Sequence, residues 1–169
     1  MIKLIVCIDL DGNIGKNNDL LFKMKDDMAF FRNQTKGNIV LMGYNTYVSL
    51  GSKPLPDRFN LVLTDREINQ AANVCAVDNL FNTIEEYKQN SDRIRKDLFI
   101  IGGASVYDQA IENKYPDELL LTIVDTHAEN ADVAINMKSL RKRYKRAEVL
   151  NTISDDNYTA TIEKWIRRI

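Results

Sequence analysis

Two adjacent acids, Asp26 and Asp27, lie in the short segment MKDDMAFF. Met24, Met28 and Phe31 recur at i, i+4 and i+7, which predicts an amphipathic helix with an apolar stripe. Asp26 falls off this stripe and would face water, whereas Asp27 falls on it. A carboxylate in an apolar wall is costly unless it is paired, protonated or facing a ligand. Asp27 is therefore either an acid in the first turn that the helix dipole stabilises, or a group that binds a ligand or takes part in catalysis.

Two further segments could form a ligand site together. LMGYNT (Leu41–Thr46) and IIGGAS (Ile100–Ser105) each join the end of an apolar strand, through glycine, to a helix-like stretch. Glycine removes the side-chain barrier to a ligand, and a helix N-terminus offers unpaired N–H groups. Neither segment is a GxGxxG or P-loop motif, and each alone fits an ordinary turn. Because ligands of open α/β sheets bind at the carboxyl ends of strands, the pair indicates a candidate dinucleotide site.

The elements that must position these residues are short apolar strands that alternate with helix-like stretches. The expected strands are Ile2–Ile8, Asn38–Met42, Asn60–Thr64, Val74–Val77, Asp97–Ile101, Glu118–Asp125, Tyr144–Ile153 and Tyr158–Ile166. The expected helices are Asp26–Thr35, a short one that ends at Leu50, Thr83–Gln89 with a capping box (Thr83-x-x-Glu86), and Ala104–Glu112. A polar loop is expected at Asp9–Asp19.

The order of these elements predicts the fold class. Helices between continuous apolar strands favour a parallel sheet. The last two strands meet at SDDN (Ser154–Asn157) with no helix between them, which indicates an antiparallel hairpin. The predicted fold is therefore α/β, with a mixed, mostly parallel central sheet flanked by helices and a C-terminal antiparallel hairpin. Without a repeat or a linker, residues 1–169 are expected to form a single domain.

Composition and charge disfavour several classes of function. The 169 residues are 44% hydrophobic and carry a net charge of −1, which gives no basis for binding nucleic acid or an anionic membrane. No apolar run approaches the roughly 20 residues of a membrane span, and the first residues lack a signal-peptide pattern. The basic run KSLRKRYKR (Lys138–Arg146) is expected to be a solvated loop or sheet edge.

Few residues suit nucleophilic or metal chemistry. His127 is the only histidine and has no nucleophile motif with it, which disfavours covalent hydrolytic catalysis. Cys7 and Cys75 are too few for a disulfide framework and too far apart for a metal knuckle. Cys7 by itself fits an ordinary core position. We therefore expect no metal, and a reduced, cytoplasmic setting.

A series of segments resembles the dihydrofolate reductase family. In order they are MIKLIVCIDLDGNIG, the helix that carries Asp27, IVLMGYNTYVSLG, PLPDR, NLVLT, FIIGGASVY and LLLTIVD. The likeness runs from Met1 to about Asp132, with a hairpin tail to Ile169. It implies a dihydrofolate reductase-like fold and NADPH-dependent reduction of 7,8-dihydrofolate to 5,6,7,8-tetrahydrofolate, by hydride transfer to C6 and protonation at N5. One-carbon metabolism, thymidylate synthesis and inhibition by antifolates follow from the same resemblance, and nothing in the sequence suggests more than a monomer.

The resemblance gives Asp27 the role of the acid that binds the 2-amino group and N3 of the pterin. Thr122 matches a threonine linked to that acid, and Phe22 stands where the family usually has tryptophan, among the catalytic positions. Arg58, in PLPDR, matches the arginine that grips the glutamate α-carboxylate of the substrate. The other substrate contacts implied are Ile5, Cys7, Met28, Phe31, Arg32, Leu50, Ile101 and Tyr107.

The resemblance also implies a set of cofactor contacts, a mobile lid at Asp9–Lys23 and a cis peptide bond at Gly102–Gly103. The cofactor contacts are Cys7, Ile14, Gly15, Leu20, Gly43, Tyr44, Asn45, Thr46, Leu63, Thr64, Asp65, Arg66, Ile101, Gly102, Gly103, Ala104, Ser105, Val106 and Tyr107.

Three departures from the family pattern affect the predicted chemistry. Phe22 lacks the indole N–H that helps to place a water near the pterin, and Leu21 replaces a proline, which leaves the lid less restrained. Tyr44 stands where a basic residue often helps to hold the 2′-phosphate of NADPH. Thr64 and Arg66 are therefore the predicted phosphate contacts. Because the neighbouring Asp65 would repel a phosphate if it pointed inward, we expect weaker discrimination against NADH.

Two other functions remain open at this point. A riboflavin-pathway pyrimidinone reductase shares the fold, but it would not need Asp27 on this helix face or Arg58 after PLPD. A ligand-binding relative that kept the fold and lost turnover is the second alternative, and the Phe22 substitution is its main support.

Overall fold

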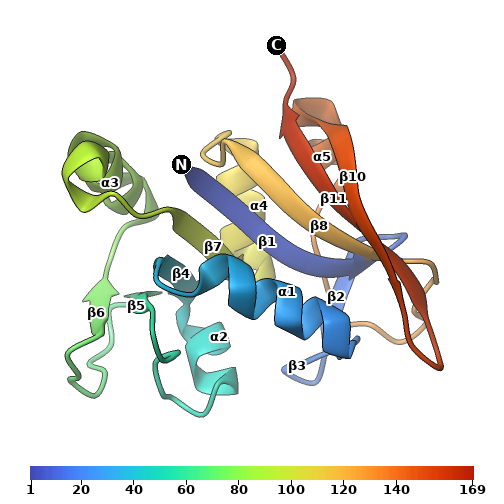
Figure 1. Ribbon diagram of the computed structural model, residues 1–169. Coiled ribbons are helices and arrows are strands. Elements are labelled where there is room, and N and C mark those ends of the chain that lie inside the picture. The colour runs from blue at the N-terminus through green and yellow to red at the C-terminus, as the bar shows by residue number, and fades with distance from the viewer.

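The computed structural model describes residues 1–169 and contains one large and one small β-sheet (Figure 1). The large sheet has the strand order β10-β11-β8-β1-β7-β4-β5-β6. Its strands are β1 (Ile2–Asp9), β4 (Ile39–Gly43), β5 (Phe59–Leu63), β6 (Val74–Val77), β7 (Leu98–Gly102), β8 (Glu118–Val124), β10 (Tyr144–Ser154) and β11 (Thr159–Arg167). The small sheet, β3-β2-β9, contains β2 (Asn13–Lys16), β3 (Asp19–Leu20) and β9 (Val133–Ala134). The helices are α1 (Lys25–Thr35), α2 (Tyr44–Ser49), α3 (Leu80–Ile94), α4 (Ala104–Glu112) and α5 (Met137–Arg143).

The large sheet is parallel except at its C-terminal edge. Strands β8, β1, β7, β4, β5 and β6 pair in parallel, whereas β11 runs antiparallel to both β8 and β10. In the turn between β10 and β11, the Asp155 carboxylate accepts hydrogen bonds from the backbone N–H groups of Asn157 and Tyr158, at 2.8 and 2.7 Å. The predicted fold class is therefore confirmed.

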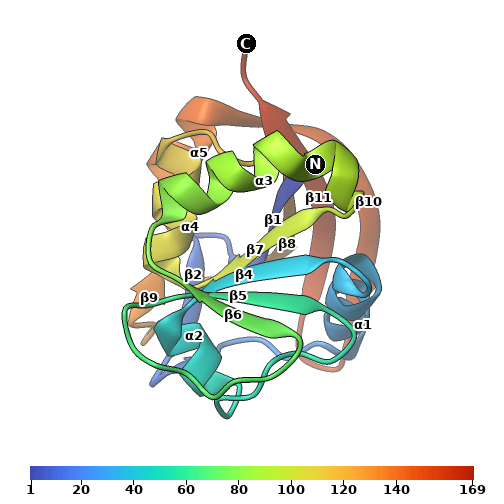
Figure 2. The same ribbon diagram turned by 90° about the vertical axis from the view of Figure 1, so that its left-hand side faces the viewer.

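Side chains of β1 alternate between the two faces of this sheet, as the period of a strand requires. Leu4, Val6 and Ile8 join the largest buried cluster, to which α3, α4 and α5 contribute. Ile5 belongs to a second cluster, which includes Tyr47 of α2 and the inner side of α1. Figure 1 shows α1 in front of the sheet and α4 behind it, and Figure 2 shows α3, α4 and α5 gathered on one side. The helices therefore flank both faces of the sheet.

The start of α3 differs from the prediction. The helix begins at Leu80, so the capping box at Thr83-x-x-Glu86 is wrong. Asn79 is the cap instead: its backbone is extended and its side-chain oxygen accepts a hydrogen bond from Asn82 N at 2.9 Å. Asparagine is a stronger N-cap than threonine, which explains why the helix starts before Thr83.

The basic run Lys138–Arg146 was expected to be a solvated loop or a sheet edge. Most of it instead forms α5, and only its last three residues lie in the edge strand β10. Asn136 caps this helix by accepting a hydrogen bond from Ser139 N at 3.0 Å. Leu140 is fully buried in the largest cluster. The Asn136 cap and the buried Leu140 side chain therefore stabilise a helix that the charge pattern did not predict.

Tyr47 in α2 has a buried hydroxyl without a hydrogen-bond partner. Since an unsatisfied buried polar group is unfavourable, we expect Tyr47→Phe to raise the free energy of unfolding by about 1 kcal/mol. Tyr144→Phe is the matched control: the Tyr144 hydroxyl is equally buried but donates to Pro116 O at 2.8 Å. That variant should lose about 1 kcal/mol. Urea unfolding of both variants tests the pair, and a stability loss in both would show that the Tyr47 hydroxyl is satisfied in solution.

Candidate active site

Asp27 lies in the first turn of α1 and its carboxylate reaches across to β8. The Thr122 hydroxyl donates a hydrogen bond to Asp27 Oδ1 at 2.5 Å. Thr122 pairs in register with Cys7 of the adjacent strand β1, so both side chains emerge on the face of the sheet that α1 covers. Asp26 is exposed, as predicted. The acid on the apolar stripe therefore has a polar partner from the sheet.

Burial sets the protonation of this group. It raises the pKa of Asp27 above its ordinary value, and the hydrogen bond from Thr122 offsets only part of the shift. Burial and the negative charge of Asp27 also raise the pKa of the Cys7 thiol, which therefore stays protonated at neutral pH. The pKa of the buried Tyr107 hydroxyl is also raised, mainly by burial and further by the negative charge of Asp27. Asp27 is the only one of the three that can change charge below neutral pH.

The apolar residues implied as substrate contacts differ in their exposure. Met28 is 52% exposed, so the expectation that it completes a buried stripe is wrong. Leu50, after α2, is 38% exposed, whereas Ile5 is buried in the sheet. Phe31 and Ile101 are half-buried against the second cluster, and Arg32 is exposed on α1. Open apolar surface next to Asp27 is what a flat aromatic ligand requires.

Phe22 lies inside the protein rather than at an open surface. It is 5% exposed and packs with Met24, Val124 and Ile153. Its ring meets that of Tyr158 edge to face, with centroids 5.1 Å apart. Phe22 therefore contributes apolar packing and has no group that could donate a proton.

The two glycine-containing strand ends lie side by side. Met42 pairs with Gly102, and a Cβ atom placed on Gly43 would lie 3.8 Å from Gly103 N. Gly102 has a φ of 137°, which favours glycine, and a Cβ there would lie 3.0 Å from the Thr46 hydroxyl oxygen. The Gly102–Gly103 peptide bond is cis, as the resemblance predicts. A side chain at either strand end would fill the space along this edge, which fits a cofactor that lies against the backbone.

The predicted cofactor contacts in α2 and α4 differ in their exposure to solvent. Ser105 and Asn45 are exposed, Ala104 is half-buried and Val106 is buried. Tyr107 is buried, and its hydroxyl donates to Ile5 O at 2.8 Å. A Cβ on Gly102 would lie 3.6 Å from that hydroxyl, which also feels the charge of Asp27. Tyr107 thus lies between the glycine edge and the Asp27 carboxylate. Its hydroxyl is already used in the hydrogen bond to Ile5 O.

The segment expected as a polar loop, Asp9–Asp19, forms β2 and begins β3. Gly15 pairs with Leu20 and with Val133, and a Cβ on Gly15 would lie 2.7 Å from Asp19 O, so the hairpin requires glycine there. Leu20 is 56% exposed. Strand β2 thus tethers this segment to β9, and the lid motion implied by the resemblance stays a prediction.

The base of this segment is held by the buried carboxylate of Asp9. It accepts hydrogen bonds from the backbone of Asp11, Asn13 and Ala128 and from the Asn13 side chain, at 2.7 to 2.9 Å. Burial alone would raise the pKa of Asp9, but these bonds hold it below its ordinary value. Ile14 of β2 is buried in the largest cluster, which makes it a core residue as well as a predicted cofactor contact.

Arg58 lies at the start of β5, apart from the glycine edge. Its Nη1 donates to the buried Thr35 hydroxyl at 3.2 Å and its Nε donates to Pro56 O at 2.8 Å. Burial lowers the pKa of Arg58, the nearby charge of Asp57 opposes this shift and that of Arg32 adds to it. The guanidinium is therefore fixed in place, with remaining donors for an anion.

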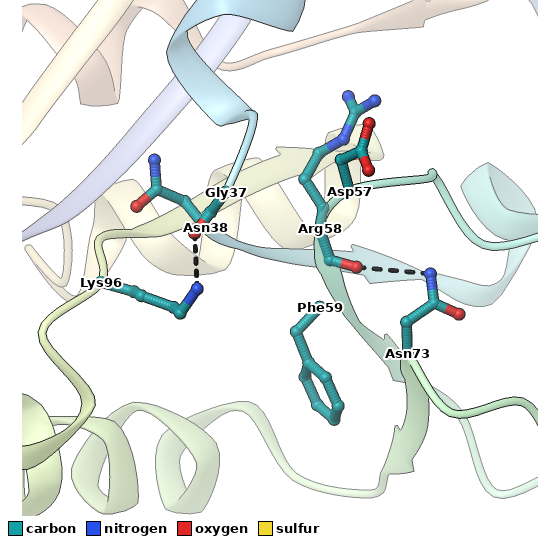
Figure 3. Close-up of a pocket in the computed structure, with 7 residues that line it drawn as sticks. All are labelled: Gly37, Asn38, Asp57, Arg58, Phe59, Asn73 and Lys96. Carbon is teal, nitrogen blue, oxygen red and sulfur yellow. Dashed lines mark hydrogen bonds between the residues drawn. The ribbon is translucent and has the colours of Figure 1, made fainter.

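A cavity of about 270 Å³ lies next to Arg58, at the amino ends of β4, β5 and β7 (Figure 3). Its lining residues are Gly37, Asn38, Asp57, Arg58, Phe59, Asn73 and Lys96. Figure 3 shows the Arg58 guanidinium directed away from the Phe59 ring. Lys96 Nζ donates to Gly37 O at 2.8 Å, so this cation has a partner within the protein.

A second cavity, of about 620 Å³, lies at the carboxyl ends of β5 and β6 and the start of α3. Its lining residues are Thr64–Arg66, Cys75–Asp78, Asn82, Thr83 and Glu86. The predicted contacts Thr64, Asp65 and Arg66 therefore lie together, and Leu63 precedes them, half-buried. The Arg66 guanidinium carbon lies 4.9 Å from the centroid of the Tyr44 ring.

Sequence reasoning missed three buried polar residues that support the site. Thr35 fixes Arg58, and Asp9 fixes the base of the lid segment. Asn60 is fully buried, and its side chain bonds Leu55 N and O at 2.9 and 3.0 Å, which braces the turn before Arg58. The sequence signals these three residues only in that each is a polar residue at, or directly next to, one end of a predicted helix or strand.

Some features of the structure bear on the other classes of protein considered above. No helix is both long and apolar enough to cross a membrane. No group of three or more His, Cys, Asp or Glu residues is placed to hold a metal ion. His127 is exposed and its Nδ1 lies 2.7 Å from a carboxylate oxygen of Asp11.

Fold and site together define an α/β protein with a glycine-lined edge for a nucleotide and a half-buried carboxylate near it. A profile described as dihydrofolate reductase matches residues 1–167. The chain is 34% identical to a dihydrofolate reductase of Ureaplasma parvum over 125 residues, which cover 73% of this chain and 75% of that protein. A solved dihydrofolate reductase from Enterococcus faecalis, complexed with NADP(H) and RAB-propyl, aligns with a TM-score of 0.81 and 25% identity over 100% of this chain and 97% of that one. The chain belongs to the dihydrofolate reductase family.

Two other relatives are much longer than this chain. It is 31% identical over 168 residues to a protein named segregation and condensation protein A from Mycoplasmoides gallisepticum, covering 99% of this chain and 26% of that protein. It also covers 28% of a bifunctional dihydrofolate reductase-thymidylate synthase from Paramecium tetraurelia, with 31% identity. The chain thus spans about a quarter of the length of these two relatives.

Proposed function

We propose that this chain reduces 7,8-dihydrofolate to 5,6,7,8-tetrahydrofolate with NADPH. Membership of the dihydrofolate reductase family supports this reaction, and the observation that carries it is the half-buried Asp27 carboxylate held by Thr122. One-carbon metabolism and thymidylate synthesis would use the product. The chain acts as a reductase on a small-molecule substrate, and antifolates are its expected inhibitors.

Asp27 binds and orients the pterin in this proposal. The 2-amino group and N3 of a pterin are donors, which suit a carboxylate that accepts hydrogen bonds. Ligand binding replaces the water that burial has removed from Asp27, so the pterin offsets the cost of a buried charge. The raised pKa also lets Asp27 hold a proton closer to neutral pH, for delivery to N5 through a water. Open apolar surface at Met28 and Leu50 receives the ring system.

The residues of the glycine edge fit NADPH. Gly43 and the Gly102–Gly103 peptide present backbone where a Cβ would intrude, and α4 begins directly after Gly103. Its N-terminus supplies N–H groups suited to a pyrophosphate. NADPH, when bound, supplies the hydride for C6 of the pterin. Tyr107, between this edge and Asp27, is a positioning residue through its bond to the backbone of Ile5.

The proposed reaction predicts loss of absorbance at 340 nm when the protein is mixed with NADPH and dihydrofolate, because NADPH is oxidised. The protein with Asp27→Asn should show little change under the same conditions, which excludes a contaminating reductase. Binding of both ligands without oxidation would identify a non-catalytic relative. Oxidation of NADPH by a ribosylated aminopyrimidinone, but not by dihydrofolate, would identify the riboflavin-pathway alternative.

We further propose that residues 1–169 form one domain that works as a monomer in the cytoplasm. The large sheet supports one domain, since it pairs strands from β1 near the start of the chain with strands as late as β11. Both cysteines are free, which fits a reducing compartment.

A further inference from the structure

The cavity at the carboxyl ends of β5 and β6 has an unusual charge balance for a site that would receive a phosphate. Its lining includes three acids, Asp65, Asp78 and Glu86, and a single cation, Arg66. The acids would repel a phosphate, and the repulsion is greatest for a phosphate with more than one negative charge. Any preference for a phosphorylated ligand in this cavity therefore depends on Arg66.

Arg66 is held by a contact from the neighbouring strand end. Strands β4 and β5 pair in parallel, with Gly43 opposite Leu63, so the residues that follow them lie side by side. Tyr44, which follows Gly43, is half-buried against the second cluster, and the Arg66 guanidinium stacks on its ring at 4.9 Å. The backbone N–H of Arg66 donates to the Thr64 hydroxyl at 3.0 Å, which fixes the turn.

Stacking matters because Arg66 is otherwise exposed. A free arginine loses considerable rotamer entropy when it binds an anion, and a guanidinium that already lies on an aromatic ring loses less. The Tyr44 ring is itself anchored by packing, so it can serve as a fixed platform. The phenol hydroxyl is not needed for this contact, since the attraction comes from the ring face.

We propose that Tyr44 is a positioning residue for cofactor choice, whose ring holds Arg66 over the cavity so that one arginine supplies the positive charge for the 2′-phosphate of NADPH. This inference rests on the proposed function, because NADPH and NADH differ only in that phosphate. Asp65 works against the same preference, since it lines the same cavity and carries a negative charge.

The test is the ratio of the dissociation constants of NADH and NADPH, measured by calorimetry without substrate. Arg66→Ala is expected to lower this ratio by about 10- to 100-fold, the value of a charge-assisted contact. Tyr44→Ala is expected to lower it by about two- to fivefold, the value of an exposed cation–π contact. Tyr44→Phe is the matched control and should leave the ratio within about twofold, because it keeps the ring.

The double variant separates positioning from a general structural effect. In the Arg66→Ala background, Tyr44→Ala should change the ratio no further, because the residue it positions is gone. Asp65→Asn should raise the ratio. The inference is overturned if Tyr44→Ala weakens NADH and NADPH equally, or if the effects of the two alanine substitutions are additive. Failure of the proposed function looks different, because the unaltered protein would then leave NADPH unoxidised in the presence of dihydrofolate, whatever the ratio of the two dissociation constants.

Discussion

Replacing Asp27 with asparagine is expected to lower kcat for dihydrofolate by about 100- to 10,000-fold at pH 7, the range for losing a group that handles a proton. Asparagine keeps the size of the side chain and can still accept the Thr122 hydrogen bond. It cannot hold a proton or carry the charge that the pterin donors require. The dissociation constant of NADPH is the control and should stay within about twofold, since Asp27 has no proposed contact with the cofactor. Near-normal turnover at pH 7 would contradict the role of Asp27.

The same substitution has a pH-dependent effect on stability. Burial raises the pKa of Asp27 in the folded protein above the unfolded value of about 3.9. As the pH rises through this window the unfolded chain ionises first, so the free energy of unfolding falls, and the loss is complete above the folded pKa. Asp27→Asn removes this loss and should be neutral or stabilising at pH 7. In urea unfolding, the advantage of the variant should shrink towards about pH 4. A variant that is clearly less stable at pH 7 would show that the charge of Asp27 stabilises the fold.

Most strands of the large sheet could be predicted because they are short apolar runs between polar residues, whereas β2, β3 and β9 are too short and polar to show such a pattern. Val74–Val77 and helix Ala104–Glu112 have the predicted bounds, since Gly103 before α4 and the polar residues around β6 mark the ends. The start of α3 was missed because Thr83-x-x-Glu86 matches a capping box, whereas the stronger cap, Asn79, lies four residues earlier. Helix α5 was missed because a single buried residue, Leu140, gives no periodic pattern.

Only those parts of the site that depend on neighbouring residues in the sequence could be predicted from sequence patterns. Asp27 is visible because it breaks an apolar stripe within one helix. Its partner Thr122 is 95 residues away, and no local pattern connects a threonine in β8 with an acid in α1. The contact of Tyr44 with Arg66 likewise depends on the register of β4 and β5. The family resemblance supplied Thr122, and the stack required the three-dimensional structure.

Arg58→Leu is expected to raise the KM for dihydrofolate by about 10- to 150-fold, while the KM for NADPH stays within about twofold. The structure fixes the Arg58 guanidinium through Thr35 and Pro56 but leaves donors for a carboxylate. Leucine keeps apolar bulk and removes the whole ionic contact. Steady-state kinetics at 340 nm give both constants. Lys96→Met is the matched control, because Lys96 lines the cavity next to Arg58 and bonds Gly37 O. That variant should leave both constants near their original values.

A substrate without the glutamyl tail shows whether Arg58 binds the substrate or only braces the fold. A simple dihydropterin has no α-carboxylate, so its kcat/KM should be the same with Arg58 and with leucine. The Thr35 hydroxyl acts through Arg58, so Thr35→Val should raise the KM for dihydrofolate by less than Arg58→Leu does and should leave the dihydropterin unaffected. If Arg58→Leu instead weakens both substrates and NADPH to the same degree, the arginine serves the turn at Pro56 and the end of α1, and the substrate carboxylate must bind elsewhere.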